Sequence, residues 1–272
     1  MRETTGRPSA YFERVADDRL VPTVHAGGAW SDDEQHFSPV GGLLVHEIDR
    51  HRAREGRPAL PMGRVSFDIL GRIGFEEFEV EVETVRPGRT IELVQATMLI
   101  GGRSVVTARA WFLATLDTEA VAVVDAGQLP GPESAEPWPL SSVWSGGYIA
   151  SLDTRRVGQA RPGRGTVWAS SRVDLVAGER AGATASFVAL VDTANGIAVR
   201  QDPAEWMFPN LDLTIHLFRQ PEGEWTGLDT TVTFGGSGQG LTSTVLHDVR
   251  GPVGSAQQIL TVRPQPATVP AR

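Results

Sequence analysis

Gly102-Arg103-Ser104-Val105-Val106-Thr107 is a glycine turn followed by strand-forming residues, and Gly251-Pro252-Val253-Gly254-Ser255-Ala256 repeats this order 149 residues later. Further upstream, Phe67-Asp68-Ile69 matches Leu211-Asp212-Leu213 at an offset of 144, and insertions explain the difference between the two offsets. A repeat of this length indicates a duplicated domain, because the units of a solenoid recur every few tens of residues. We therefore expect two sibling modules with the functional site between them.

The first half predicts one helix followed by an antiparallel meander. Apolar residues from Val40 to Ile48 recur at helical spacing within residues 39–54, with Ser38 as a cap and Pro39 in the first turn. Apolar and β-branched runs, separated by glycine or proline turns, then predict strands. These strands cover residues 64–70, 76–85, 90–100 and 104–116.

The second half repeats this order after a connector. Residues 125–139 hold four prolines and two glycines, which is typical of a linker. An apolar stripe from Phe187 to Ala198 predicts the second helix. Strands are expected at 143–152, 166–175, 206–218, 226–234, 240–249 and 254–262. We expect an N-terminal module over residues 1–124, a linker over 125–140, and a C-terminal module with the site over 141–272.

The composition excludes several classes of function. The chain has no cysteine, which removes disulfides, thiol nucleophiles and cysteine-ligated metals. A net charge of −8 without a clustered Lys/Arg face argues against nucleic acid as a partner. No apolar run is long enough to span a membrane, and Met1–Thr5 lack the apolar core of a signal peptide. We therefore expect a cytoplasmic protein with no membrane partner.

One long helix packed on an antiparallel sheet, made twice, is an α+β design. From Trp30 to Arg263 this order resembles the double hotdog of the type II acyl-CoA thioesterases and the thioesterase-like superfamily. The resemblance implies that the edge strands of the two modules form one continuous sheet. The most recognisable segments are His36–Leu44, Val191–Gly196, Asn210–His216 and Gly254–Gln258.

In that family an aspartate on the second helix, a hydroxyl residue at the next strand and a glutamine on the last strand hold the hydrolytic water. The resemblance places these catalytic roles on Asp192, Asn210 and Gln258. Asn210 departs from the family, which carries threonine there, although an amide both donates to and accepts from water. The implied function is hydrolysis of an acyl thioester on CoA or an acyl carrier, without a cofactor.

Thioester hydrolysis needs a positioned water, a carboxylate that takes its proton, and donors aimed at the developing oxyanion. Backbone N–H groups at a helix N-terminus supply such donors, and Gly41-Gly42 or the residues around Asp192 are the candidates. The alternative function is a non-catalytic hotdog that binds an acyl chain or serves in assembly. A hydratase or dehydratase ranks last, because the accompanying motif is missing.

Each proposed site residue also has a structural interpretation. Asp192 suits a solvated carboxylate, and Asn210 after Pro209 suits a turn. Only one of Gln257 and Gln258 can face the site, because neighbouring strand residues point to opposite faces. Asp212 alternates with leucines and is expected to point outward.

Other polar groups predict no further centre. His46 and His51 are five residues apart, which does not match the i, i+4 pair of helical zinc sites. Residues 235–240 lack the ending of a phosphate loop and predict a hairpin turn. His36 precedes the first helix, at the pseudo-symmetric mouth of the second site, and is assigned to a cap or loop and left outside the site.

The duplication itself implies asymmetry. At the offset of 149, Arg109 stands where the second copy has Gln258, and at an offset of 151 Gly41 stands opposite Asp192. One of the two equivalent sites is therefore expected to carry the chemistry while the other is structural. Exposed sheet edges leave self-association into a homo-oligomer open.

Overall fold

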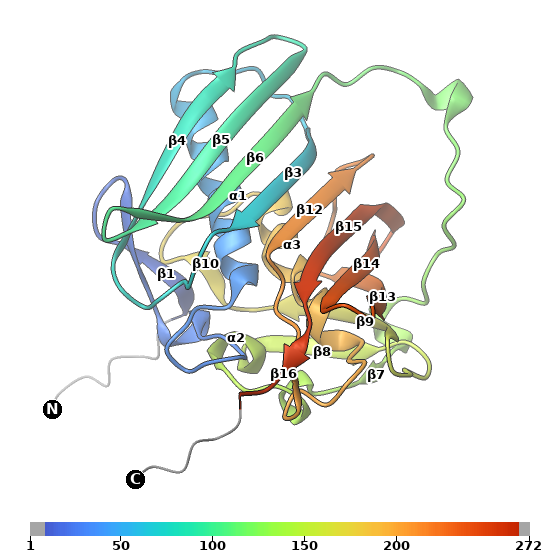
Figure 1. Cartoon of the computed structure of the whole chain (residues 1–272). Coiled ribbons are helices and arrows are strands. Elements are labelled where there is room, and N and C mark those ends of the chain that lie inside the picture. Colours follow the sequence, from blue (N-terminus) through green and yellow to red (C-terminus); the bar gives the residue numbers. More distant parts are fainter. Residues whose placement is uncertain (1–8, 267–272) are drawn as a thin grey trace, which may run out of the picture.

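The structure, a computed structural model, describes residues 9–266 of the 272 in the chain, so that Met1–Thr5 lie outside the described residues. The first half builds six strands and one long helix (Figure 1). They are β1 (Ala10–Arg14), β2 (Arg19–Pro22), α1 (Phe37–Arg54), β3 (Met62–Ile69), β4 (Phe78–Arg86), β5 (Ile91–Ile100) and β6 (Arg103–Leu113). A short 3-10 turn, η1 (Val24–Ala26), precedes α1.

The second half repeats this plan with a shorter helix. Its main elements are β8 (Leu152–Arg156), β9 (Arg164–Ser171), α3 (Ala183–Val191), β12 (Asp212–Leu217), β13 (Thr226–Phe234), β14 (Gln239–Asp248) and β15 (Gly251–Thr261). The short helices are η2 (Glu119–Val121), η3 (Pro132–Ser134), η4 (Leu140–Ser142), α2 (Gly147–Ala150) and α4 (Ala194–Ile197). The short strands are β7 (Glu136–Pro137), β10 (Asp174–Val176), β11 (Trp206–Met207) and β16 (Arg263–Pro264).

Both halves contribute to one sheet of 14 strands in the order β10-β1-β2-β4-β5-β6-β3-β12-β15-β14-β13-β9-β8-β7. The halves meet where β3 and β12 pair antiparallel, with Ser66 opposite Thr214. The sheet curves around α1 and α3, whose apolar residues fill the space that it encloses (Figure 1). The expected α+β double hotdog with a continuous sheet is confirmed.

The halves are also joined at the far edge of the sheet. β10 belongs to the second half, yet it pairs in parallel with β1 of the first half, with Ala10 opposite Asp174 and Phe12 opposite Val176. The Tyr11 hydroxyl lies 2.6 Å from Ser151 Oγ and 2.7 Å from Ser171 Oγ. The first strand of the chain is therefore bound on one side by the second module.

Irregularities in the strand ladders define how the two copies correspond. The β5–β6 and β14–β15 ladders each shift register once, and an isolated bridge on β15 repeats the first pair of the β3–β6 ladder. The matching landmarks are Met98 and Leu246 at the register shifts, and the pairs Met62–Phe112 and Asn210–Leu260. Each of these residues of the second half lies 148 positions after its counterpart in the first half.

The offsets of 149 and 144 expected from the sequence are therefore wrong, although the duplication is real. Asp68 and Asp212, which the offset of 144 makes equivalent, are instead directly opposite each other in the β3–β12 ladder. The offset of 144 arises because an apolar-polar alternation looks the same after a shift of an even number of residues, whereas a register shift marks one position. The offset of 149 comes from matching Gly102 with Gly251, and an error of one residue exchanges the two faces of the strand. Only the ladders resolve the correspondence.

Close packing of α1 on α3 depends on one glycine. A Cβ atom built on Gly42 would lie 2.5 Å from the Ala189 Cβ and 2.8 Å from the Ala185 carbonyl oxygen. At the neighbouring Gly41 the nearest atom is a Phe37 ring carbon at 3.4 Å. Only Gly42 is therefore required for the approach of the two helices.

We expect Gly42→Ala to lower the free energy of unfolding by about 1–3 kcal/mol, because the new methyl group forces the helices apart. Gly41→Ala is the matched control and is expected to be neutral or slightly stabilising, because alanine favours the helix by up to about 1 kcal/mol. Urea unfolding of both variants measures the difference. Equal stabilities would show that the helix contact adapts without cost.

Several predicted elements differ from the structure. Residues 143–152 do not form one strand, because Gly146 adopts φ 110° and α2 follows before β8 begins. Residues 206–218 form two strands, β11 and β12, and Pro209 in the gap cannot donate to a ladder. The N-cap of α1 is His36 and not Ser38, which lies inside the helix.

Candidate active site

Asp192 lies where the second helix breaks. α3 ends at Val191 with Asp192 as its C-cap, and α4 begins two residues later at Ala194. The Asn195 side chain donates to the Phe208 carbonyl at 3.0 Å, and the Thr193 hydroxyl lies 2.7 Å from the Tyr148 hydroxyl. These contacts fix the break, so the predicted single helix over residues 187–198 is in fact two.

The three residues expected at the site come together. Asp192 Oδ1 accepts hydrogen bonds from Asn210 Nδ2 at 2.8 Å and from Gln258 Nε2 at 2.6 Å. Gln258 is 1% exposed, whereas Gln257 points to the outer face, so the choice between them is resolved for Gln258. The alternative of a solvated carboxylate for Asp192 does not hold, because the residue is 6% exposed.

Burial makes Asp192 an unusual carboxyl group. Desolvation raises its pKa from 3.8 to about 6, and the hydrogen bonds from Asn210 and Gln258 limit the rise. Both amides donate to Oδ1, which leaves Oδ2 free of them. Oδ2 lies 3.8 Å from Nδ1 of His36. One carboxylate oxygen is therefore held in place, and the other remains available as an acceptor near neutral pH.

Asp192 and Asn210 open onto a cavity of about 420 Å³, whereas Gln258 lies behind Asp192. Its walls combine aromatic and aliphatic side chains with polar groups, as in most small-molecule sites. The apolar lining includes Trp30, Phe37, Ile73, Leu140, Trp144 and Ile149. The cavity can hold an apolar chain with its reactive group at the carboxylate.

His36 lies next to Asp192, although its sequence pattern predicts only a cap or loop. It caps α1, as expected, because its Nδ1 accepts from the Ser38 N–H at 3.1 Å. It also lines the cavity beside Asp192. The sequence signal for this role is the position of His36 directly before the first helix. Because α1 packs antiparallel on α3, the start of α1 lies beside the end of α3 and thus beside Asp192.

Most of the backbone donors suggested by the sequence make hydrogen bonds within the protein. Gly41 and Gly42 lie in the second turn of α1, where amides bond to carbonyls within the helix. The amides of Thr193, Asn195 and Gly196 bond to the carbonyls of Leu190, Asp192 and Thr193, respectively. The amides of Gly41, Gly42, Thr193, Asn195 and Gly196 are therefore not free to meet an oxyanion.

The sequence profile described as "Acyl-CoA thioesterase N-terminal domain" matches residues 27–113, and the one described as "Acyl-CoA thioesterase C-terminal domain" matches residues 128–262. Together they cover most of the chain. The chain belongs to the acyl-CoA thioesterase family. It is therefore a thioester hydrolase.

Solved structures share the fold of this thioesterase at low identity. An acyl-CoA thioesterase II from Mycobacterium marinum has 16% identity and a TM-score of 0.67, covering 95% of this chain and 97% of that chain. The tesB protein of Mycobacterium avium subsp. paratuberculosis has 16% identity and a TM-score of 0.65, over 93% and 96%. A protein of unknown function with a hotdog fold from Alicyclobacillus acidocaldarius has 12% identity and a TM-score of 0.71, covering 93% of this chain and 96% of that chain. No curated protein sequence matches the thioesterase significantly.

The equivalent position in the first module of the thioesterase lacks the amide pair. At the offset of 148, Gln258 corresponds to Ala110 and Asn210 to Met62, both buried and apolar. The expectation of Arg109 opposite Gln258 is wrong, because Arg109 is exposed on the outer face of β6. The asymmetry expected between the two sites is present, with different residues.

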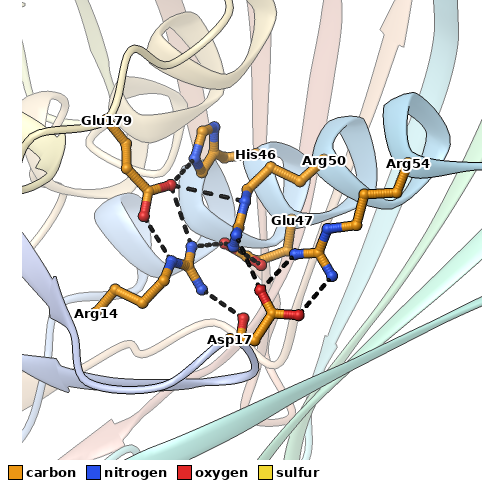
Figure 2. A network of polar contacts seen from close by, with 7 residues as sticks. All are labelled: Arg14, Asp17, His46, Glu47, Arg50, Arg54 and Glu179. Atoms are coloured by element: carbon orange, nitrogen blue, oxygen red, sulfur yellow. Dashed lines mark hydrogen bonds and ion pairs between the residues drawn. The ribbon is translucent and has the colours of Figure 1, made fainter.

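An ionic network fills this second position (Figure 2). The helices correspond at an offset of 146, counted from the first residue of each, and not at the 148 of the strands. The counterpart of Asp192 in α1 is therefore His46 and not Gly41. His46 Nε2 lies 2.9 Å from Glu179, and the Arg14 guanidinium bonds to both Glu179 and Glu47. The side-chain atoms of His46, Glu47 and Glu179 are close enough for a metal ion, but Arg14 already provides their positive partner.

Among residues 9–266, no helix of the thioesterase has the length and apolar character needed to cross a bilayer.

Proposed function

We propose that this thioesterase hydrolyses acyl-CoA, with Asp192 as the general base for the attacking water. The observation that supports this is the free Oδ2 of a buried carboxylate that lines a cavity with aromatic and aliphatic side chains, with a pKa of about 6. A base is most effective when its pKa lies near the working pH, because it is then both ionised and able to hold a proton.

The reaction needs only groups that the chain supplies. Asp192 Oδ2 removes a proton from water while the water oxygen attacks the thioester carbon, and the carbonyl π pair moves onto oxygen. The tetrahedral species then collapses, the C–S bond breaks, and the departing thiolate takes the proton from the Asp192 carboxyl group. The products are the free acid and CoA, and Asp192 is ionised again.

Asn210 and Gln258 have different parts in this proposal. Both N–H groups of the Asn210 amide are used, one on Asp192 and one on the Asp212 carbonyl at 3.1 Å, so its oxygen is the group left for the water. Gln258 does not line the cavity and acts as a positioning residue that holds the carboxylate. Asparagine thus replaces the expected threonine, with its donor on the base and its acceptor toward the cavity.

We expect kcat/KM for acyl-CoA hydrolysis to rise with pH through about 6 and to level off above it, because Asp192 accepts a proton only when ionised. Thiol release measured with a dithiodipyridine reagent over pH 4.5–8 tests this, and the protein has no cysteine to contribute background. A rate that falls as pH rises would contradict a carboxylate base. Binding of acyl-CoAs without any thiol release would favour the non-catalytic acyl-binding alternative.

A further inference from the structure

One ring nitrogen of His36 accepts a hydrogen bond from the backbone, and the other has no partner within the described residues. Nδ1 accepts from the Ser38 N–H, so the neutral ring carries its proton on Nε2. Nε2 makes no hydrogen bond within residues 9–266. It is not a buried atom, because the buried side-chain atoms without a partner do not include it. The side chain is 15% exposed, and His36 lines the cavity. The Nε2–H group is therefore accessible to a ligand in the cavity.

The ring is held in one orientation. It stacks on Tyr148 with ring centroids 4.2 Å apart, and Tyr148 is fixed by hydrogen bonds to Thr193 and to the Ala189 carbonyl. Nδ1 is also the atom of the ring that faces Asp192 Oδ2. The N–H of Nε2 is thus preorganised, with its direction set by Ser38 on one side and Tyr148 on the other.

The ring is neutral at the pH of the reaction. Burial lowers the pKa of His36 to about 3, even though Asp192 lies beside it. Glu34, Arg72 and Arg263 are further charged residues that line the cavity, and Glu34 and Arg72 form an ion pair with each other at 3.3 Å. A neutral imidazole donates a hydrogen bond without giving up its proton, which suits stabilisation of an oxyanion.

We propose that His36 is a further catalytic residue, whose Nε2–H donates a hydrogen bond to the thioester carbonyl oxygen and to the oxyanion formed from it. This rests on the proposed function. As water attacks and its proton passes to Asp192, the carbonyl π pair becomes the third lone pair of the oxyanion. The Nε2 proton stays on nitrogen throughout, and the hydrogen bond weakens again when the C–S bond breaks. His36 offers a donor that the amides of Gly41, Gly42, Thr193, Asn195 and Gly196, which bond within the protein, do not.

Two reciprocal variants separate catalysis from capping. The His36→Asn side chain keeps an acceptor for the Ser38 N–H but is too short to present a donor where Nε2 lies. The His36→Gln side chain keeps an N–H donor near that point and loses the cap. We expect His36→Asn to lower kcat by about 10², with KM changed little, because an oxyanion donor acts mainly in the transition state. We expect His36→Gln to recover part of this loss despite a lower melting temperature.

A spectroscopic measurement tests the contact directly. An acyl-CoA labelled with ¹³C at the carbonyl is bound to Asp192→Asn, which is expected not to hydrolyse it. The carbonyl stretch should lie at lower frequency in this variant than in Asp192→Asn/His36→Asn, because the hydrogen bond from Nε2 weakens the C=O bond. An unchanged stretch would overturn the role of His36.

The outcomes distinguish the two proposals. Hydrolysis by Asp192→Asn at the parent rate contradicts the proposed function. Loss of hydrolysis in Asp192→Asn, combined with parent kcat in His36→Asn, leaves the proposed function in place and overturns the role of His36. A kcat lower in His36→Gln than in His36→Asn also overturns it, because activity would then follow the cap and not the donor.

Discussion

Asp192→Asn should lower kcat for acyl-CoA hydrolysis by about 10³, the middle to upper part of the range for loss of a general base. The substitution changes almost nothing else. The new carbonyl oxygen keeps both hydrogen bonds that Oδ1 receives from Asn210 and Gln258. Only Oδ2, the proposed proton acceptor, is replaced by a group that cannot take a proton. The fold should be intact, and Asp192→Ala should be equally inactive.

Asp68→Asn is the matched control. Asp68 is exposed on the outer face of β3, and its loss of charge should leave kcat and KM unchanged. Purified parent and variants are compared by thiol release from a panel of acyl-CoAs of different chain length, which also identifies the preferred acyl group. Equal rates for parent and Asp192→Asn across the panel would exclude Asp192 as the base.

Asp192→Asn should also make the protein more stable near neutral pH, by roughly 2–3 kcal/mol. The folded-state pKa of Asp192, about 6, lies above the unfolded value of 3.8. A group with a raised folded-state pKa stabilises the fold fully below the unfolded pKa and loses this contribution as pH rises through the folded pKa. Above pH 6 the ionised, buried carboxylate is therefore a cost, which asparagine removes.

Urea unfolding of the parent and Asp192→Asn at pH 4 and pH 8 measures this directly. The stability difference should be small at pH 4 and large at pH 8. Asp68→Asn removes an exposed like charge opposite Asp212 and should show a dependence of less than about 1 kcal/mol. A difference of the same size at both pH values would mean that Asp192 is not strained by its charge. The expected result links activity to stability, because the ionised Asp192 carboxylate that is proposed to act as the base also lowers the stability of the fold.

Much of the fold was readable in the sequence for a physical reason. The meander strands from Arg64 to Leu116 and from Thr226 to Val262 have alternating or apolar runs bounded by glycine turns, and periodicity of this kind survives in the folded chain. The helix of the first half was located to within two residues at its start, because Pro39 and the apolar stripe mark it. The convergence of Asp192, Asn210 and Gln258 followed from the resemblance, and their geometry agrees with it.

The rest depends on contacts between distant segments. Nothing in the local pattern tells whether Gln257 or Gln258 faces inward, since either is compatible with the strand, and the β14–β15 register decides it. His36 gains its position from antiparallel helix packing across the two modules, 156 residues from Asp192 in the chain. Residues 143–152 carry β-forming side chains, but Gly146 with positive φ turns the backbone away.

The parallel pairing of β10 with β1 has a consequence for how this protein can be divided. Each half made alone would expose unpaired backbone donors and acceptors along two of its borders, at β3 or β12 and at β1 or β10. Separately expressed fragments cut in the proline-rich connector should thus aggregate, whereas co-expressed fragments should recombine into a nicked enzyme. The two halves behave like interlocked partners of a dimer that happen to share one polypeptide.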